Sequence, residues 1–133
     1  MKYEDLKSII NLENDSELHL VNNDWFLAEG CNHVIGEWLS KGDFLKLFSD
    51  LSQYVVNEKI YVFETFERIY KSNGIAKRLC ADFNFNWDDF SKFQNSSEMI
   101  SFYLVPNDLS WVFYVNDDYW AFRKATKPFK QDF

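Results

Sequence analysis

Apolar residues recur every three or four positions in two segments of the N-terminal half. The first, near 2–12, predicts a short helix. The second, 40–56, is the clearest helix, because its apolar positions fall on one face. Ser40 followed by Asp43 resembles a capping box, in which the serine hydroxyl satisfies a free N–H of the first turn. Shorter helices are predicted from Phe66 to just before Asn73, over 75–82 and over 87–93.

Three further segments in the first half are typical of strands. Residues 18–21 and 25–28 are apolar runs separated by Asn22 and Asn23, and asparagine tolerates the positive φ of a tight turn. This pattern predicts that 25–28 returns alongside 18–21. Residues 59–64 are rich in β-branched and aromatic side chains, which also favours a strand.

The last third contains three strand-like runs, 99–105, 110–115 and 119–123, separated by short polar turns. Short turns between neighbouring strands predict an antiparallel meander. The middle run is apolar on both faces, which favours a central strand covered on both sides, and the alternative is one exposed face that binds a partner. The tail from residue 124 is expected to be frayed. The fold class predicted is α+β, with helices packed on a mainly antiparallel sheet that ends in a three-stranded C-terminal meander, in a single domain of residues 1–133.

Composition and charge exclude several classes of protein. The chain has 133 residues, 20% of them aromatic, and a formal net charge of −7. A chain this rich in large aromatic residues can bury enough apolar surface to fold, which excludes a disordered chain. The excess of acidic residues argues against direct nucleic-acid binding, which depends on Lys and Arg. The N-terminus has no pattern of a secretory signal, and no run approaches the roughly 20 apolar residues needed to cross a bilayer. We therefore expect a cytoplasmic protein without a membrane partner.

The charge is unevenly distributed along the chain. Residues 1–67 carry 13 acids and 5 bases, whereas residues 119–133 carry 4 bases and 1 acid. The N-terminal half is therefore the acidic half.

Cysteine and histidine suggest one alternative chemistry. Cys31 and His33 lie between Glu29 and Glu37, and these residue types bind zinc or form a nucleophile–base pair. Only one Cys–His pair is present, with His19 on a separate predicted strand, and a loop thiol with a solvated histidine explains the same residues. We therefore predict no catalytic residue, no metal and no cofactor. For Cys31 and Cys80, two buried free thiols are favoured over a disulfide.

Acidic residues stand next to aromatic ones in two blocks, 82–90 and 116–120. Trp and Tyr anchor protein interfaces, and carboxylates around them steer and bind a basic partner. The alternative is structural, with Trp87 and Phe90 on the buried face of a short helix and the aspartates as charges of its first turn. The predicted partner-binding residues are Asp82, Trp87, Asp88, Asp89, Asp117, Asp118, Tyr119 and Trp120.

The first block resembles part of a known family. The run Asn86, Trp87, Asp88, Asp89, Phe90 is similar to the Asn-x-Asp-Ala-Leu/Phe helix of barstar-type ribonuclease inhibitors, over five residues of the chain. Those proteins are small, acidic and intracellular, and they use acidic residues to plug the basic active site of a nuclease. In composition the chain also resembles bacterial immunity proteins of polymorphic or contact-dependent toxin systems.

The charge and the resemblance together predict a non-enzymatic immunity protein. It would bind a basic protein toxin, most simply a nuclease domain, and occlude its active site, and we expect it to be a monomer. One alternative is a general protein-interaction module or a subunit of a larger assembly. A less favoured alternative is a small Cys/His-based hydrolase or metal enzyme.

Overall fold

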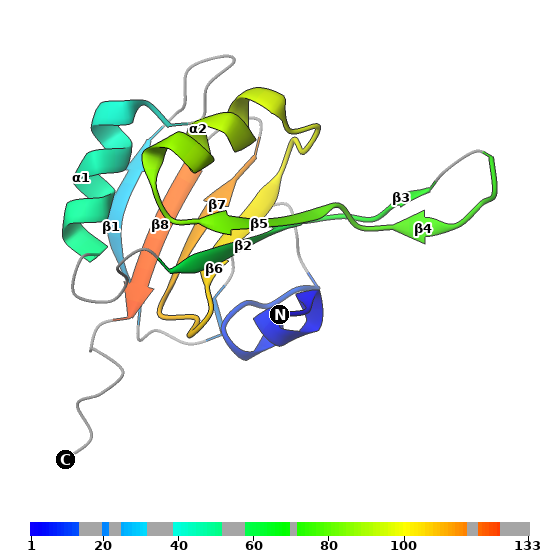
Figure 1. Cartoon of the computed structure of the whole chain (residues 1–133). Coiled ribbons are helices and arrows are strands. Elements are labelled where there is room, and N and C mark those ends of the chain that lie inside the picture. The colour runs from blue at the N-terminus through cyan, green and yellow to red at the C-terminus, as the bar shows by residue number, and fades with distance from the viewer. Residues whose placement is uncertain are drawn as a thin grey trace.

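A six-stranded sheet forms the centre of the molecule (Figure 1). The computed structural model describes residues 1–13, 20–21, 25–31, 39–51, 58–69, 72–116 and 120–125. Every neighbouring pair of strands in this sheet is antiparallel. In spatial order the strands are β1 (Trp25–Cys31), β8 (Trp120–Ala125), β7 (Trp111–Val115), β6 (Phe102–Pro106), β2 (Lys59–Glu64) and β5 (Cys80–Asn84).

The C-terminal meander is confirmed as β6, β7 and β8, which are adjacent in the sheet. All five residues of β6 and all five of β7 are buried. The prediction of a central strand covered on both sides is therefore confirmed, and the alternative of an exposed binding face on β7 is wrong. The turn between β6 and β7 closes where the Leu109 N–H donates to the Pro106 carbonyl at 3.1 Å, with Leu109 at a φ of 57°.

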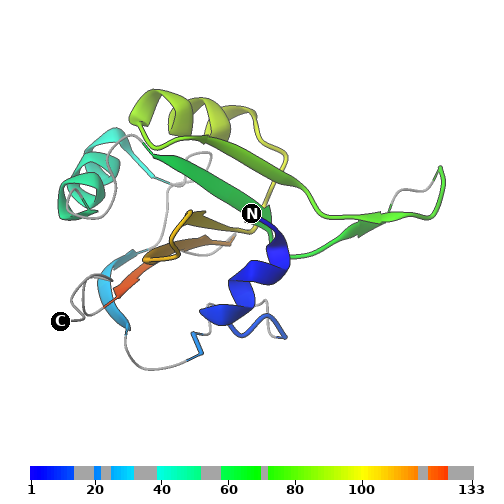
Figure 2. The same ribbon diagram turned by 60° about the horizontal axis from the view of Figure 1, so that its bottom comes forward.

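Helices cover both faces of the sheet, as Figure 2 shows edge-on. Two of them, α1 (Lys41–Leu51) and α2 (Trp87–Ser96), lie on one face, and the 3-10 helix η1 (Tyr3–Ser8) lies on the other. Side chains alternate between these two cores along β2, β6 and β7. In β2, for example, Ile60 and Val62 join the core under α1 and α2, whereas Phe63 joins the core under η1. The α+β class follows from this arrangement.

The predicted start of the helix at 40–56 agrees with the structure. The N–H of Asp43 donates to Ser40 Oγ at 3.2 Å, which caps α1 as the sequence predicts. The first helix is shorter than predicted and is a 3-10 helix, and 52–57, the end of the second prediction, lie outside the described residues. No helix among the described residues is long and apolar enough to cross a membrane.

The two helices predicted between residues 66 and 82 are wrong, because the described residues there, 66–69 and 72–82, form strands and a turn. It forms a two-stranded hairpin, β3 (Arg68–Ile69) with β4 (Ala76–Lys77), and then continues into β5. Gly74 adopts a φ of 70°, and Asn73 Oδ1 accepts the N–H of Ile75 at 2.9 Å, so these residues form a turn. Residues 80–82, which end the helix predicted over 75–82, belong instead to β5 and pair with β2.

The segment 25–28 is a strand, but its described partner differs from the prediction. The whole of β1 pairs with β8, at the opposite end of the sequence. Leu20 forms an isolated bridge with Ile10 instead. Residues 14–19 and 22–24, with the rest of the predicted hairpin and its turn, lie outside the described residues, as do residues 126–133 of the tail.

Candidate functional site

The first predicted block forms the junction between β5 and α2. Asn86 is extended, and its Oδ1 accepts the N–H of Asp89 at 2.8 Å, so it is the N-cap that starts the helix. Asp88 is exposed and Asp89 is half-buried, both in the first turn of α2. Carboxylates at this position are favoured by the positive end of the helix dipole, so they contribute to stability as well as to surface charge.

Trp87 stands between the two helices and is half-buried. Its ring centroid lies 5.5 Å from that of Phe44 in the first turn of α1. Phe90, one turn further along α2, is fully buried and stacks on the same Phe44 ring at 5.2 Å. Phe90 is therefore a core residue, as the structural alternative predicted, whereas Trp87 keeps part of its surface in solvent.

The contact between Phe44 and Trp87 brings the two helix starts together. Asp43 is exposed and adjoins Phe44 in the chain, just as Asp88 adjoins Trp87. Three carboxylates, those of Asp43, Asp88 and Asp89, therefore belong to the first turns of the two helices that meet at the Phe44–Trp87 contact. We call this set, with Trp87, the acidic helix-start surface. The sequence argument did not group Asp43 with this block, because only the packing of Phe44 reveals that the two helix starts meet.

Asp82 does not join this surface. Its neighbours in β5, Ala81 and Phe83, pack against the core under α2, so the alternation of the strand directs Asp82 to the opposite face. There Asp82 pairs with Lys59 at 3.4 Å, and both side chains are about half exposed, at 53%. Such an exposed pair contributes little stability, and Asp82 stays accessible.

The second predicted block has one member that needs correction. Trp120 is only 1% exposed and packs at 5.6 Å from Phe113, so it is a core residue and not a surface anchor. Its position in β8, between β1 and β7, explains this burial. Asp117, Asp118 and Tyr119 lie outside the described residues.

The residues of the alternative catalytic chemistry lie largely outside the described part of the chain. Within it, no group of three or more His, Cys, Asp or Glu residues could hold a metal ion. His19 and His33 lie outside the described residues, as does the side chain of Cys31. Cys80 is a free thiol but is exposed, so the prediction of a buried thiol is wrong for this residue, which lies on the edge strand β5.

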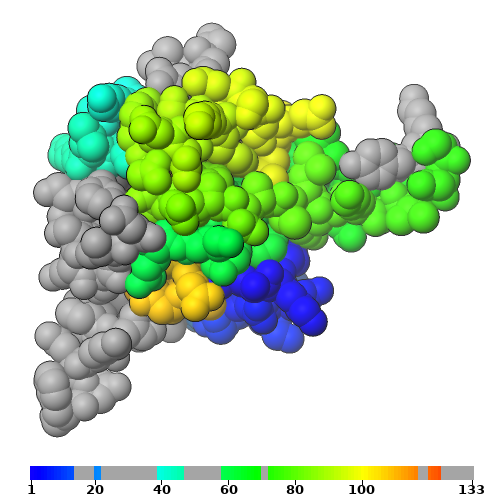
Figure 3. Space-filling model, viewed as in Figure 1, coloured from blue at the N-terminus to red at the C-terminus, as the bar shows by residue number. Residues whose placement is uncertain are grey.

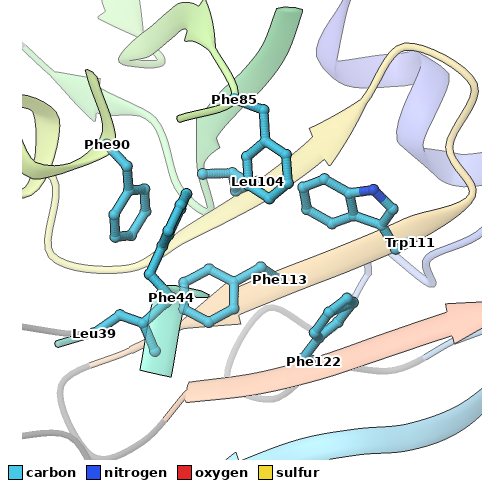
Figure 4. Close-up of a pocket in the computed structure, with 8 residues that line it drawn as sticks. All are labelled: Leu39, Phe44, Phe85, Phe90, Leu104, Trp111, Phe113 and Phe122. Atoms are coloured by element: carbon cyan, nitrogen blue, oxygen red, sulfur yellow. The ribbon is translucent and has the colours of Figure 1, made fainter. Parts of the chain in front are cut away.

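The core under α1 and α2 contains a small apolar cavity (Figure 4). Its volume is about 20 Å³, close to that of a single water-sized probe. Its walls are all apolar, so it is a packing gap that stays dry and is too small for a ligand. The residues around it are Leu39, Phe44, Phe85, Phe90, Leu104, Trp111, Phe113 and Phe122.

A feature that the sequence argument missed is the arm, which we define as the described residues 66–69 and 72–78 and which contains β3 and β4. In Figures 1 and 3 it projects beyond the rest of the molecule. At its base the Glu64 side chain is fully buried and accepts two hydrogen bonds from Arg68, at 2.8 and 2.9 Å. Arg68 also donates to the Glu98 carbonyl at 2.7 Å. These bonds attach the arm to the body of the protein.

A second arginine strengthens the same attachment. Arg78, on the returning side of the arm, donates to the Glu64 carbonyl at 2.6 Å. Its guanidinium carbon lies 3.5 Å from the centre of the Tyr3 ring, a close cation–π contact with η1. Asn73 and Gly74 were the sequence signal for the arm, because this pair is typical of hairpin turns. The helical spacing of Phe66 and Ile69 concealed it.

Comparison with protein-family models, curated proteins and solved structures finds no match to this chain.

Proposed function

We propose that this protein is a non-enzymatic inhibitor that binds and neutralises a basic protein toxin, most simply a nuclease domain, in the cytoplasm. The observation that carries the proposal is the acidic helix-start surface, in which the first turns of α1 and α2, with Asp43, Asp88 and Asp89, meet at the contact of Phe44 with the half-buried Trp87. A partly exposed indole supplies an apolar anchor, and carboxylates beside it accept paired hydrogen bonds from arginine. The net charge of −7 adds a long-range attraction to any basic partner.

The proposed mechanism is occlusion of the toxin's active site. A nuclease cleft is basic because it binds phosphates, and the carboxylates of Asp43, Asp88 and Asp89 would occupy the positions of those charges. Trp87 would fill the apolar part of the cleft. The protein would act by binding alone, without a catalytic residue, metal or cofactor of its own. Because steering between charged surfaces is screened by salt, association should slow as ionic strength rises.

The first experiment asks whether the protein protects a cell. The product of the neighbouring reading frame is expressed with and without this protein, and growth is measured. Protection from a product that is toxic alone supports the proposal. A product that is harmless alone, or toxicity that this protein does not change, contradicts it.

The second experiment locates the binding surface with a purified toxin and a titration. Asp88→Asn/Asp89→Asn should weaken binding at least tenfold, because it removes two charges and leaves the shape of α2 unchanged. Glu4→Gln/Glu13→Gln is the matched control, since it makes the same change in net charge at two exposed sites of the N-terminal segment, away from α2. Asp117→Asn/Asp118→Asn tests the second predicted block. Equal weakening by the control would mean that only overall charge matters, and normal binding by both aspartate pairs would mean that the site is elsewhere.

A further inference from the structure

The strand β5 forms one edge of the central sheet, where it pairs with β2 on one side. In Figure 3, which has the same view as Figure 1, β5 is visible at the surface below α2 and continues into the arm. Cys80, Asp82 and Asn84 are exposed along it. An edge strand presents backbone N–H and C=O groups with which another strand can pair, and native proteins usually block such pairing.

The hydrogen bonds at the two ends of the β2–β5 pairing show which residues of β5 bond to β2. At one end the Glu64 N–H donates to the Leu79 carbonyl at 2.9 Å, and at the other the Phe85 N–H donates to the Glu58 carbonyl at 2.8 Å. In an antiparallel pair, residues that bond to the neighbouring strand alternate with residues whose backbone groups point the other way. The odd-numbered residues of this segment, 79 to 85, therefore bond to β2.

The backbone groups of Cys80 and Asp82 consequently point away from β2, out of the sheet. No residue in the described part of the chain hydrogen-bonds to the N–H or C=O of either residue. The next carbonyl in this row, that of Asn84, already accepts the N–H of Asn86 at 2.9 Å. The open part of the edge is therefore centred on Ala81, between Cys80 and Asp82.

The two edges of the sheet differ in their regularity. At the opposite edge, β1 has a bulge between Leu27 and Glu29, and a bulge hinders the pairing of a further strand. In contrast, β5 pairs with β2 in an unbroken register and contains neither lysine nor proline. Its one charged residue, Asp82, is paired with Lys59. The edge at β5 therefore lacks the features that commonly keep another strand away.

The two faces of β5 indicate which kind of strand fits this edge. Leu79, Ala81 and Phe83 are half-buried and pack against the core under α1 and α2, whereas Cys80 and Asp82 are exposed on the other face. A strand that extends the sheet here should therefore be apolar at alternate positions on the α2 side and polar between them. A second copy of β5 has this pattern. Two identical strands that pair antiparallel about a twofold axis keep their equivalent faces on the same side of the joined sheet.

We propose that β5 of one copy pairs antiparallel with β5 of a second copy about a twofold axis at Ala81, which joins the two sheets into one. In this register Cys80 of each copy lies opposite Asp82 of the other, and their outward N–H and C=O groups bond to each other. Leu79 lies opposite Phe83, so apolar side chains meet on the α2 side. A register centred on Asp82 would place two carboxylates directly opposite each other, which is destabilising. The proposal does not depend on a toxin.

Sedimentation velocity of the protein alone, over a range of concentrations, tests the pairing. The wild-type protein should change from monomer to dimer as concentration rises. Asp82→Pro removes an outward N–H and no bond to β2, so it should raise the dimer dissociation constant at least tenfold. Asp82→Asn is the matched control, because it removes the same charge and keeps the N–H, and its dimer should be at least as stable as that of the wild type. A wild-type protein that stays monomeric throughout, or equal dissociation constants for the two variants, would overturn the proposal.

Disulfide trapping tests the register, and it does not require the proline variant to fold. In Cys80→Ser/Ala81→Cys the two introduced thiols face each other across the axis, with Cα atoms about 4.5 Å apart, which is within reach of a disulfide. This variant should form a covalent dimer on oxidation. The control Cys80→Ser/Asp82→Cys should form little, because its thiols lie diagonally across the pair. Cross-linking at position 82 in place of 81, or at neither position, would overturn the proposal.

Two further observations separate this dimer from other uses of the same edge. Cys80 should react with a thiol reagent in dilute protein and react more slowly at concentrations where the dimer forms, because Asp82 of the second copy then lies opposite it. An unchanged rate in a demonstrated dimer would mean that the contact is elsewhere. If the wild-type protein is monomeric and Asp82→Pro loses binding to the toxin, β5 belongs to that interface and the proposal is wrong.

Discussion

The carboxylate of Glu64 is fully buried, and both of its oxygens accept hydrogen bonds from the guanidinium of Arg68, four residues further along the chain. Glu64 is the last residue of β2, and Arg68 is the first residue of β3. The ion pair therefore spans the bend at which the chain leaves the central sheet to form the arm. A buried charge is costly without its partner, so this pair couples the arm to the core.

Arg68→Ala should lower the free energy of unfolding by about 3 kcal/mol, the lower end of the range for a broken buried pair, because Arg68 is partly exposed. The measurement is a urea denaturation curve. Glu64→Met/Arg68→Met should recover part of this loss, since no buried charge remains. An equal loss in the single and double variants would show that the arginine acts through packing and not through its charge.

The sheet could be predicted from the sequence where neighbouring strands are also neighbours in the chain. The short turn after Pro106 and the apolar run of β7 were enough to predict the meander and its buried centre. The pairing of β1 with β8 joins segments at opposite ends of the chain, and no local pattern encodes such a contact. In the arm, Phe66 and Ile69 have helical spacing, but the turn at Asn73 and Gly74 and the pairing of β3 with β4 decide the conformation.

The candidate site shows the same division between local and long-range information. Asn86 as a cap and the aspartates that follow it form a local pattern, so the start of α2 was predictable. The contact of Phe44 with Trp87 adds Asp43 to the surface. This contact depends on how α1 packs against α2, so it could not be predicted from the sequence. The prediction that Trp120 is a surface residue was wrong, because the acids next to it in the sequence do not indicate which strands lie on either side of β8.

Gln94 joins α2 to the segment that leads into α1. Its side chain is buried and makes a pair of hydrogen bonds with the backbone of Leu39, donating to the carbonyl at 2.8 Å and accepting from the N–H at 3.2 Å. Gln94→Leu should destabilise the protein by about 2 kcal/mol, because it leaves two buried backbone groups without partners. Thermal unfolding of the variant and of the wild-type protein measures this loss of stability. Asn95→Leu, at an exposed position of the same helix, should change stability by less than about 0.5 kcal/mol.

Trp120→Ala should destabilise the protein by about 3–5 kcal/mol, because it removes a large side chain from the core. Trp120→Phe should cost less, since a smaller cavity remains. Chemical denaturation followed by circular dichroism compares the two. A Trp120→Ala protein of wild-type stability that binds the toxin poorly would instead make Trp120 the surface anchor that the sequence predicted.

Cys80 should react with a water-soluble thiol reagent in the native protein, because its side chain is exposed and free. Mass spectrometry of the labelled peptides identifies the modified residue. Cys80→Ser should abolish labelling at this position and leave the fold unchanged. If residue 80 is labelled only after denaturant is added, the edge of β5 is covered in solution, which would point to association through that edge.

Substitutions at the start of α2 should change the stability of the protein and its affinity for the toxin independently. Asn86→Ala removes the cap of the helix and should lower the free energy of unfolding by about 1 kcal/mol. It leaves the carboxylates of Asp88 and Asp89 in place, so toxin affinity should change little. Asp88→Asn/Asp89→Asn should do the reverse, with a small loss of stability and a large loss of affinity. Calorimetric binding and urea denaturation of the same two proteins measure both quantities. A proportional loss of stability and affinity in both would show that these aspartates only support the helix.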